Sequence, residues 1–187
     1  MDDPFLAPRP ANHVPLSPLD FLKRAALVYP QQTAVVHGDW RITYATFYER
    51  CRRLASALAT AGVGKGDTVA VMAPNVPALL EAHYGVPMAG AVLNALNVRL
   101  DAASIAFCLR HGEAKVLIAD RDFAPVVRAA LAELATPPRV IDIVDPAGRD
   151  GHTPGMSVGA IDFETFLAGG DPEFPWTLPD DEWQSIA

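Results

Sequence analysis

The sequence predicts an α/β fold, a doubly wound and largely parallel sheet with helices on both faces. Four short apolar runs are typical of buried strands: Thr68–Ala73, Ala91–Ala95, Lys115–Ala119 and Arg139–Val144. Helical patterns separate these runs, and strands that alternate with helices form parallel sheets through crossover connections. The chain has 187 residues, half of them apolar, which suits one domain with a substantial core.

The residues before these strands predict a short helix and a hairpin. Ser17 is a good N-cap, and Pro18 fits the first helical position, where no backbone donor is needed. Pro30 restricts the residue before it and ends this helix. The segments Thr33–His37 and Trp40–Thr43 are rich in β-formers and are separated by a Gly-Asp pair, which predicts a tight turn.

A second helix follows, with Thr43 as its expected N-cap and Gly62 as its left-handed end. Its apolar residues recur at spacings of three and four and predict one buried stripe: Tyr44, Phe47, Cys51, Leu54 and Leu58. Arg50, Arg52 and Arg53 form a basic row on this helix. We interpret the row as a solvated face with one Glu49–Arg53 pair, in preference to a binding patch.

The crossover helices also carry start and stop signals. Asn75 is the expected cap of a helix that has Leu79, Leu80 and His83 on one face, and Pro87 should kink or end it. Asp101 is the expected cap of the next helix, which runs through Arg110 and ends at Gly112. A further helix is predicted at about 123–135.

The last part of the chain is richer in turns. Residues 145–160 contain many Gly and Pro residues, a short helix is predicted around 162–167, and the tail reads as extended. We therefore divide the chain into an extended lead-in at 1–16, an α/β subdomain at 17–144 and a loop-rich connector at 145–187.

Composition excludes several classes of protein. A formal net charge of −7 argues against a general nucleic-acid binder, which needs a cationic footprint. The start of the chain lacks the features of a secretory signal, so we expect a cytoplasmic protein. The longest apolar region, 76–96, is interrupted by Glu81, His83 and two prolines and makes a poor membrane span. Cys51 and Cys108 lack metal-site spacing and are expected to be buried free thiols.

Other possible motifs are absent or lack the structural context that their function requires. The glycine cluster at 62–67 precedes a strand, whereas a dinucleotide fingerprint follows one, so a turn is the better interpretation. The chain contains no Walker sequence and no G-x-S-x-G elbow, and its five histidines lack the i,i+4 spacing of helical zinc ligands.

In open parallel sheets, ligands bind beyond the carboxyl ends of the strands. This rule selects Pro74-Asn75, Asn97–Arg99, Asp120 and Asp142–Asp145. Arg99 is the fixed cation of this set, and its planar guanidinium suits phosphate oxygens. A surface ion pair of Arg99 with Asp101 or Glu113 is an equally good interpretation from the pattern alone.

Two further candidates have simpler explanations. His83 could border a ligand cavity, but a histidine on an apolar helix face is more often a packing residue. Asp142 and Asp145 could form an acid and base pair. At the end of a buried strand, however, such carboxylates more often accept hydrogen bonds from backbone N–H groups of a loop.

The order of several short segments resembles the N-terminal subdomain of an AMP-binding, adenylate-forming acyl-CoA synthetase. Each segment is weak alone, and the resemblance rests on their common order over about a hundred residues. The segments are Ala34–Val36, Thr43-Tyr44, Gly66–Val71, Ala73–Asn75, Met88–Val92, Asn97–Leu100 and Lys115–Ile118.

The resemblance implies an acid:CoA ligase that acts on a fatty or aromatic carboxylic acid. Such an enzyme joins the acid to ATP as an acyl-adenylate and then transfers the acyl group to CoA, with Mg²⁺ required. In some relatives, an arginine in the position of Arg99 contacts a phosphate of the CoA nucleotide. The phosphate-binding loop and the other catalytic residues of the family lie downstream of Ala187. Val98 stands where many relatives have proline.

We therefore expect the 187 residues alone to be inactive, to bind none of these cofactors tightly and to self-associate through exposed apolar surface. A non-catalytic binding or scaffolding module derived from the same subdomain is the alternative. A nicotinamide-dependent oxidoreductase is disfavoured because its fingerprint is missing.

Overall fold

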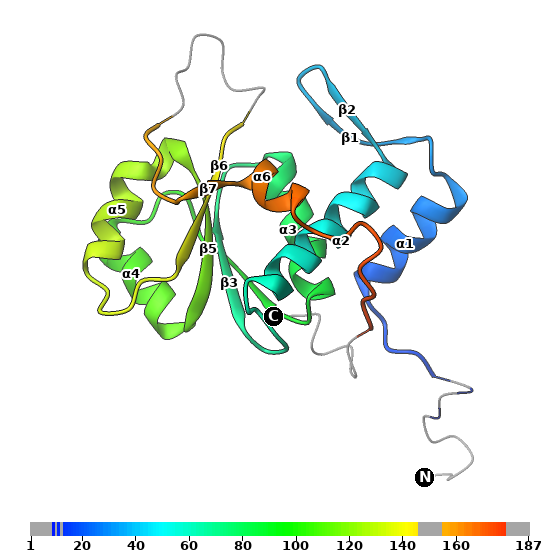
Figure 1. Ribbon diagram of the computed structural model, residues 1–187, viewed down its shortest axis with the longest axis horizontal. Helices are drawn as coiled ribbons and strands as arrows, with labels where there is room; N and C mark the ends of the chain where they lie inside the picture. Colours follow the sequence, from blue (N-terminus) through cyan, green and yellow to red (C-terminus); the bar gives the residue numbers. More distant parts are fainter. Residues whose placement is uncertain (1–8, 10, 12, 146–154, 179–187) are drawn as a thin grey trace.

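Residues 9, 11, 13–145 and 155–178 are described by the computed structural model of the protein. A five-stranded parallel sheet stands at its centre, with helices on both faces (Figure 1). The sheet strands are β3 (Thr68–Met72), β4 (Val92–Ala95), β5 (Ala114–Asp120), β6 (Arg139–Ile143) and β7 (Ile161–Asp162). The separate hairpin consists of β1 (Thr33–His37) and β2 (Trp40–Thr43). This architecture confirms the predicted α/β class.

Six α-helices and one short 3₁₀ helix occur in the described part of the chain. They are α1 (Pro18–Val28), α2 (Tyr44–Thr60), α3 (Pro77–Met88), α4 (Ala102–His111), η1 (Arg121–Phe123), α5 (Ala124–Ala132) and α6 (Phe163–Ala168). Ser17, Thr43, Asp101 and Asp162 each accept a hydrogen bond from a backbone N–H in the first turn of the helix that follows. The first three of these caps were predicted.

The strand order β4-β3-β5-β6-β7 determines where a ligand site can form. The chain passes from β3 to β4 on one side, then crosses β3 and continues through β5, β6 and β7. The order therefore reverses between β3 and β5, and the carboxyl ends of these two strands form the switch point of the fold.

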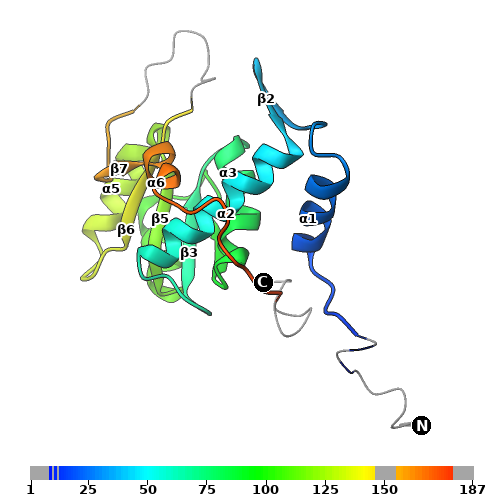
Figure 2. The same ribbon diagram turned by 45° about the vertical axis from the view of Figure 1, so that its right-hand side comes forward.

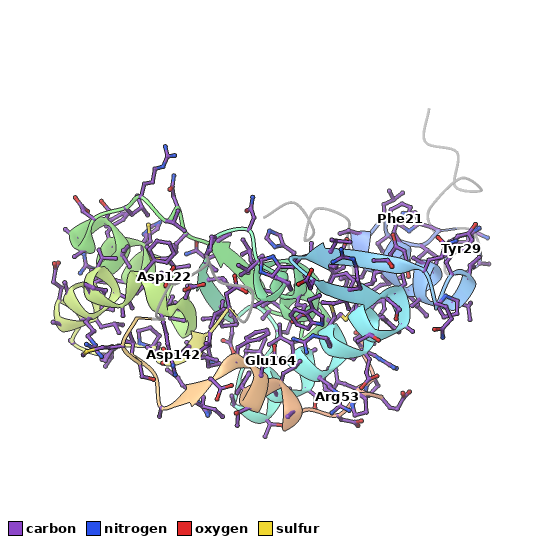
Figure 3. All side chains as sticks on the ribbon, turned by 90° about the horizontal axis from the view of Figure 1, so that it is seen from above. Phe21, Tyr29, Arg53, Asp122, Asp142 and Glu164 are labelled. Carbon is purple, nitrogen blue, oxygen red and sulfur yellow. The ribbon has the colours of Figure 1, made fainter. Side chains whose placement is uncertain are left out.

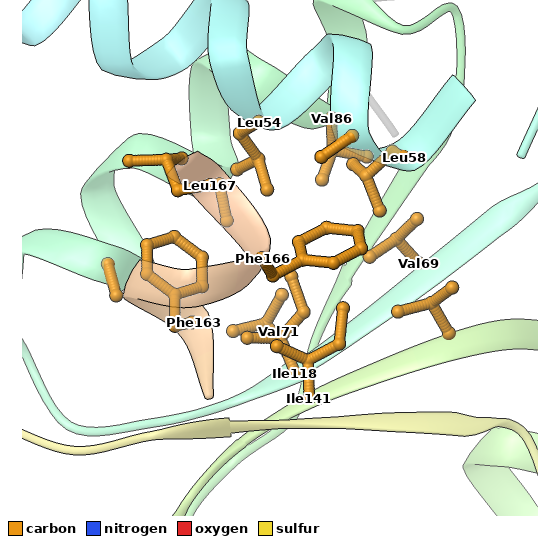
Figure 4. Close-up of a cluster of buried hydrophobic side chains, with 14 of the residues drawn as sticks. Leu54, Leu58, Val69, Val71, Val86, Ile118, Ile141, Phe163, Phe166 and Leu167 are labelled. Carbon is orange, nitrogen blue, oxygen red and sulfur yellow. The ribbon is translucent and has the colours of Figure 1, made fainter. Parts of the chain in front are cut away.

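Alternate residues of the strands face two separate cores. Val69, Val71, Ile118 and Ile141 pack against α2, α3 and α6, as Figure 4 shows. On the opposite face, Ala70, Met72, Leu117 and Ala119 pack against α4 and α5. Because both faces are covered, the strands read as continuous apolar runs rather than as alternating ones.

A third cluster joins α1 and the hairpin to the rest of the molecule. It includes Leu19 and Leu22 of α1, Ile42 of β2, and Phe47 and Cys51 of α2. Figure 2 shows α1 beside α2, with the hairpin above them. The predicted stripe of α2 is thus buried at Phe47, Cys51, Leu54 and Leu58, whereas Tyr44 is only partly buried.

The predicted start of α3 was wrong. Val76 is the N-cap, no side chain caps this helix, and Asn75 is exposed. Leu80 and His83 point outward because α3 buries its small residues instead. A Cβ on Gly85 would lie 2.8 Å from Leu54 Cδ2 and 2.9 Å from the Cys51 carbonyl oxygen, so α2 approaches α3 closely. The predicted end of this helix near Pro87 was right, since α3 ends at Met88.

Residues 155–178 contribute more to the fold than a connector would. Ile161 and Asp162 form β7, an unpredicted fifth strand parallel to β6. Phe163, Phe166 and Leu167 of α6 are buried in the core between α2 and the sheet. Two strand residues are too few for a sequence pattern to show.

Several apolar side chains are exposed on α1, including Phe21 and Leu27, which are 66% and 81% exposed. Phe21 and Tyr29 lie at the outer edge of the molecule in Figure 3. Self-association through such surface stays a prediction. Among the described residues, every helix is too short or too polar to span a lipid bilayer.

Candidate functional site

The carboxyl edge of the parallel sheet gathers most of the residues that the sequence selected. Asn75 follows β3, Arg99 follows β4, Asp120 ends β5 and Asp145 follows β6. Parallel strands end at the same edge, so these side chains occupy one side of the molecule although they are up to seventy residues apart. Their local environments show which of these side chains hold the backbone in place and which are available to a ligand.

Arg99 is exposed and lies in the tight loop between β4 and α4. The Asn97 carboxamide accepts a hydrogen bond from the Arg99 backbone N–H at 2.9 Å, and Asp101 accepts one from the Ser104 N–H at 2.8 Å. Hydrogen bonds from Ser104 lower the pKa of Asp101. Within the described part of the chain, the Arg99 guanidinium has no ion pair with Asp101 or Glu113, so the ion-pair interpretation was wrong. The guanidinium can therefore meet an anion.

Asp120 and Asp142 have structural roles. Asp120 is buried and accepts a hydrogen bond from the Asp122 N–H at 2.9 Å, which starts η1. Asp142 is fully buried and accepts hydrogen bonds from the N–H groups of Val158 and Gly159 at 3.0 and 2.9 Å. The prediction that Asp142 accepts from a loop backbone is confirmed. With its oxygens used in this way, Asp142 is a poor catalytic base.

Asp145 joins the hairpin to the sheet. The His37 Nε2 atom of β1 lies 2.8 Å from the Asp145 carboxylate, and both side chains are about one-fifth exposed. The hairpin therefore reaches the carboxyl edge of the sheet just beyond the end of β6. This contact joins two residues that are 108 positions apart in the chain. Neither their residue types nor their spacing in the sequence predicts it.

Beneath the hairpin lies an open cavity of about 280 Å³. Aliphatic side chains of β1 and α3 form most of its wall, and His37, Asn75 and His83 supply its polar groups. His83 is exposed, with Nδ1 2.8 Å from the Leu79 carbonyl oxygen, so the packing interpretation of this residue was wrong. His83 was therefore named in advance as a possible cavity residue, although the packing interpretation was preferred for it.

Sequence reasoning missed an ionic cluster at the centre of the helical layer. Arg50 of α2 contacts Glu81 of α3 at 2.5 Å and Glu164 of α6 at 2.6 Å. The Glu81 side chain is fully buried and that of Arg50 is 13% exposed. The available signal was the position of Glu81 as the one carboxylate in an apolar stretch of sequence. A buried carboxylate needs a partner, so this position indicates a buried ion pair.

The basic row on α2 is therefore not a solvated face, and that prediction was wrong. Besides Arg50, Arg52 binds both carboxylate oxygens of Glu173 at 3.0 and 3.1 Å. Arg53 forms the predicted pair with Glu49 at 2.9 Å and also donates to the Gly170 carbonyl oxygen. The three arginines fix α6 and the segment that follows it onto α2.

The buried carboxyl of Glu81 should make stability depend on pH. Burial raises its pKa from 4.5 to about 6, although Arg50 acts in the opposite direction. A raised pKa means that the folded state holds the proton more tightly, so this stabilisation is present below pH 4.5 and is lost as the pH rises through 6. We expect Glu81→Gln to remove about 2 kcal/mol of pH dependence over that range.

Urea unfolding at a series of pH values would measure this difference. Glu133→Gln, at an exposed position after α5, is the matched control and should keep the slope of the unchanged protein. Identical slopes for Glu81→Gln and the unchanged protein would contradict the assignment.

The described residues offer little for metal or thiol chemistry. No group of three or more His, Cys, Asp and Glu side chains among them could hold a metal ion. Both cysteines are free, Cys51 is fully buried, and Cys108 is only partly buried, contrary to prediction. Burial raises the pKa of the Cys51 thiol, which keeps it protonated and unreactive.

The sequence matches a family model described as AMP-binding enzyme over residues 22–169. The chain belongs to the AMP-binding enzyme family. A peroxisomal acetate/butyrate–CoA ligase of Arabidopsis thaliana is 47% identical over 186 residues, which cover 95% of this chain and 33% of that relative. An acetate–CoA ligase of Humulus lupulus is 49% identical with the same coverage. The chain thus spans about a third of the length of these AMP-binding relatives.

Solved structures agree with this membership. A benzoate CoA ligase from Burkholderia xenovorans superimposes with a TM-score of 0.74 at 25% identity, over 88% of this chain and 30% of that one. The parallel sheet with helices on both faces is therefore the arrangement found at the N-terminal end of such AMP-binding enzymes.

Proposed function

We propose that this chain forms the N-terminal part of an ATP-dependent acid:CoA ligase. The complete enzyme would activate a fatty or aromatic carboxylic acid as its acyl-adenylate and then form the CoA thioester. The observation that carries this proposal is the identity of 47–49% over 186 residues to two CoA ligases. Relatives of this similarity act on acetate and butyrate by name, which favours a short acyl chain.

The carboxyl edge fits one part of this reaction. Arg99 offers an exposed guanidinium that lacks a partner among the described residues, in a loop that Asn97 and Asp101 hold in place. Its charge and shape suit a phosphate of the CoA nucleotide. When bound, ATP would supply the adenylyl group and CoA the acceptor thiol. We assign no described residue to Mg²⁺, because the donor set for it is lacking among them.

The product of the complete reading frame should convert an acid, ATP and CoA into a thioester, which chromatography with a panel of acids would detect. Acetate, butyrate, octanoate and benzoate would form the panel. Absence of any thioester from a folded, full-length product would refute the ligase proposal.

Arg99→Ala in that product should raise the KM for CoA by about tenfold or more, because a charge-assisted hydrogen bond contributes roughly 1.5–3 kcal/mol. The KM for ATP should stay unchanged, and Arg99→Lys should restore part of the loss. Arg110→Ala removes another exposed arginine on α4 and is the matched control. An unchanged KM for CoA would exclude Arg99 from CoA recognition.

The cytoplasmic location expected from the sequence is also a proposal, and the name of the peroxisomal relative weakens it. Fluorescence microscopy of the tagged full-length product would decide between the two compartments.

A further inference from the structure

The cavity beneath the hairpin, with a volume of about 280 Å³, is separate from the contact proposed for Arg99. Its lining comes from β1, from the turn before α3 and from the first two turns of α3, and the structure describes every residue of it. Small-molecule sites begin at roughly 300 Å³. The cavity therefore suits a small ligand of a single ring or a short chain.

Aliphatic side chains from two elements form most of the cavity wall. Val35 and Val36 come from β1, and Leu79 and Leu80 come from α3. Val36 is 61% exposed and Leu80 is 40% exposed, so both present apolar surface to solvent. Removal of this surface from water by an apolar molecule is favourable.

The hairpin, which supplies one wall, is held in place at two points. The His37 Nε2 atom lies 2.8 Å from the Asp145 carboxylate. On β2, the centroid of the Trp40 ring lies 5.2 Å from the guanidinium carbon of Arg50, which is itself fixed by carboxylates of α3 and α6. The wall is therefore preformed, which lowers the cost of binding.

His83 supplies this cavity with a hydrogen-bond acceptor. Its Nδ1 atom lies 2.8 Å from the Leu79 carbonyl oxygen. A carbonyl oxygen can only accept, so Nδ1 carries the proton and the neutral ring keeps Nε2 as an acceptor. Within the part of the chain that the structure describes, Nε2 makes no hydrogen bond. A ligand that meets this nitrogen must therefore be a donor.

The rest of the lining favours a ligand without charge. Apart from its two histidines, the lining contains no ionisable side chain among the described residues, so a charged ligand would lose hydration without gaining an ion pair. Asn75 is the remaining polar side chain. Seven residues of helical rise separate Val76 from His83, about 10 Å. One hydroxyl therefore cannot reach both Asn75 and His83.

We propose that this cavity binds a small neutral phenol, whose hydroxyl donates a hydrogen bond to His83 Nε2 and whose ring lies against Val36 and Leu80. A phenol is uncharged at pH 7, carries one O–H donor and has a rigid apolar body. The carboxylic acids of the proposed ligase reaction are a different class, because an ionised carboxylate only accepts hydrogen bonds. The site does not depend on the proposed ligase activity.

Titration of the ¹⁵N-labelled 187-residue chain with 4-ethylphenol, followed by NMR, tests this site, and neither ATP nor CoA is added. The amide signals of Val36, Leu80 and His83 should shift in a saturable manner. 4-Ethylanisole has a methyl group in place of the hydroxyl proton and should bind about fivefold more weakly. 4-Ethylbenzoate, which is charged and cannot donate, should also bind at least about fivefold more weakly.

His83→Phe removes the acceptor and keeps an exposed ring at the same position. This variant should weaken 4-ethylphenol binding about fivefold and so abolish the preference over 4-ethylanisole. His111→Phe, at an exposed histidine of α4 outside the cavity, is the matched control. It should leave 4-ethylphenol binding within about twofold.

Val36→Phe and Leu80→Phe test the volume independently from two elements of the wall. Both positions are exposed, so a larger side chain can enter the cavity without disturbing the core. Each variant should weaken binding of 4-ethylphenol and of 4-ethylanisole by at least about fivefold.

Absence of saturable shifts at these amides, or unchanged affinity in both folded volume variants, would overturn the proposal. Equal affinity for 4-ethylphenol and 4-ethylanisole, or tighter binding of 4-ethylbenzoate, would overturn the choice of a neutral donor. Each of these results would leave the ligase proposal intact, because thioester formation is measured separately.

Discussion

Glu81→Ala is expected to lower the free energy of unfolding by about 3–5 kcal/mol, since removing one partner of a buried ion pair leaves an uncompensated buried charge. Arg50 would retain Glu164, but that carboxylate is 56% exposed and cannot replace the two contacts made by Glu81. The cluster joins α2, α3 and α6, so its loss should loosen the whole helical layer on that face of the sheet.

Chemical denaturation would measure this effect. Glu164→Ala removes the exposed partner of the same arginine and should cost about 1 kcal/mol or less. Replacing Arg50 and Glu81 together with leucine should recover most of the loss, because no charge then stays buried. Equal destabilisation by Glu81→Ala and Glu164→Ala would show that burial does not distinguish the two carboxylates.

Asp142→Ala is expected to destabilise the protein by about 3–5 kcal/mol. Its carboxylate accepts hydrogen bonds from two backbone N–H groups, from the Ser157 hydroxyl at 2.6 Å and from Arg121 at 3.4 Å. Loss of the carboxylate oxygens of Asp142 would leave the N–H groups of 158 and 159 without their acceptor beside the sheet. The chain leading into β7 should then detach first.

Hydrogen exchange at the amides of Val158 and Gly159, together with the denaturation midpoint, would follow this change. Ser157→Ala removes one donor without orphaning an N–H group and should cost about 1 kcal/mol. Asp142→Asn keeps one acceptor oxygen and should fall between the two. Unchanged protection of both amides in Asp142→Ala would contradict this role of Asp142.

Local signals in the sequence predicted local structure well. Ser17, Thr43 and Asp101 cap helices as expected because an N-cap depends on residues within one turn. Four of the five strands of the parallel sheet were visible as apolar runs because both faces of that sheet are buried. Gly62 adopts a positive φ of 87° at the end of α2, again a local requirement.

Features that depend on distant residues were missed. The buried face of α3 is set by the close approach of α2 at Gly85, not by the apolarity of Leu79 and Leu80. Arg50 and Arg52 of α2 bind carboxylates 31 to 121 residues away, so helical spacing alone suggested a solvated face. In the same way, the partner of Asp145 is His37 of the hairpin.

The same difference between local and distant contacts applies to the candidate site. The rule for carboxyl ends of parallel strands placed Arg99, Asn75, Asp120 and Asp145 at one edge without knowledge of the contacts. It did not separate Arg99, which is available to a ligand, from Asp120 and Asp142, which hold the backbone. That separation required knowledge of which donors face each carboxylate.

The described residues form a well-packed fold, but good packing does not by itself provide a complete active site. The fold is held together by three apolar clusters, by the ionic cluster at Arg50 and by the contacts that the segment after α6 makes with α2. Among the candidates at the carboxyl edge, Arg99 is the exposed cation that we propose for phosphate binding, and a guanidinium cannot by itself activate a carboxylate. We therefore expect folding without catalysis from these 187 residues.

The exchange of labelled pyrophosphate into ATP, which reports acyl-adenylate formation alone, tests this expectation most directly. The 187-residue chain and the product of the complete reading frame would be assayed side by side with acetate, butyrate and benzoate. We predict acid-dependent exchange by the longer product and none by the shorter chain, with both proteins folded. Clear exchange by the 187-residue chain, or none by the longer product with any acid, would contradict the account.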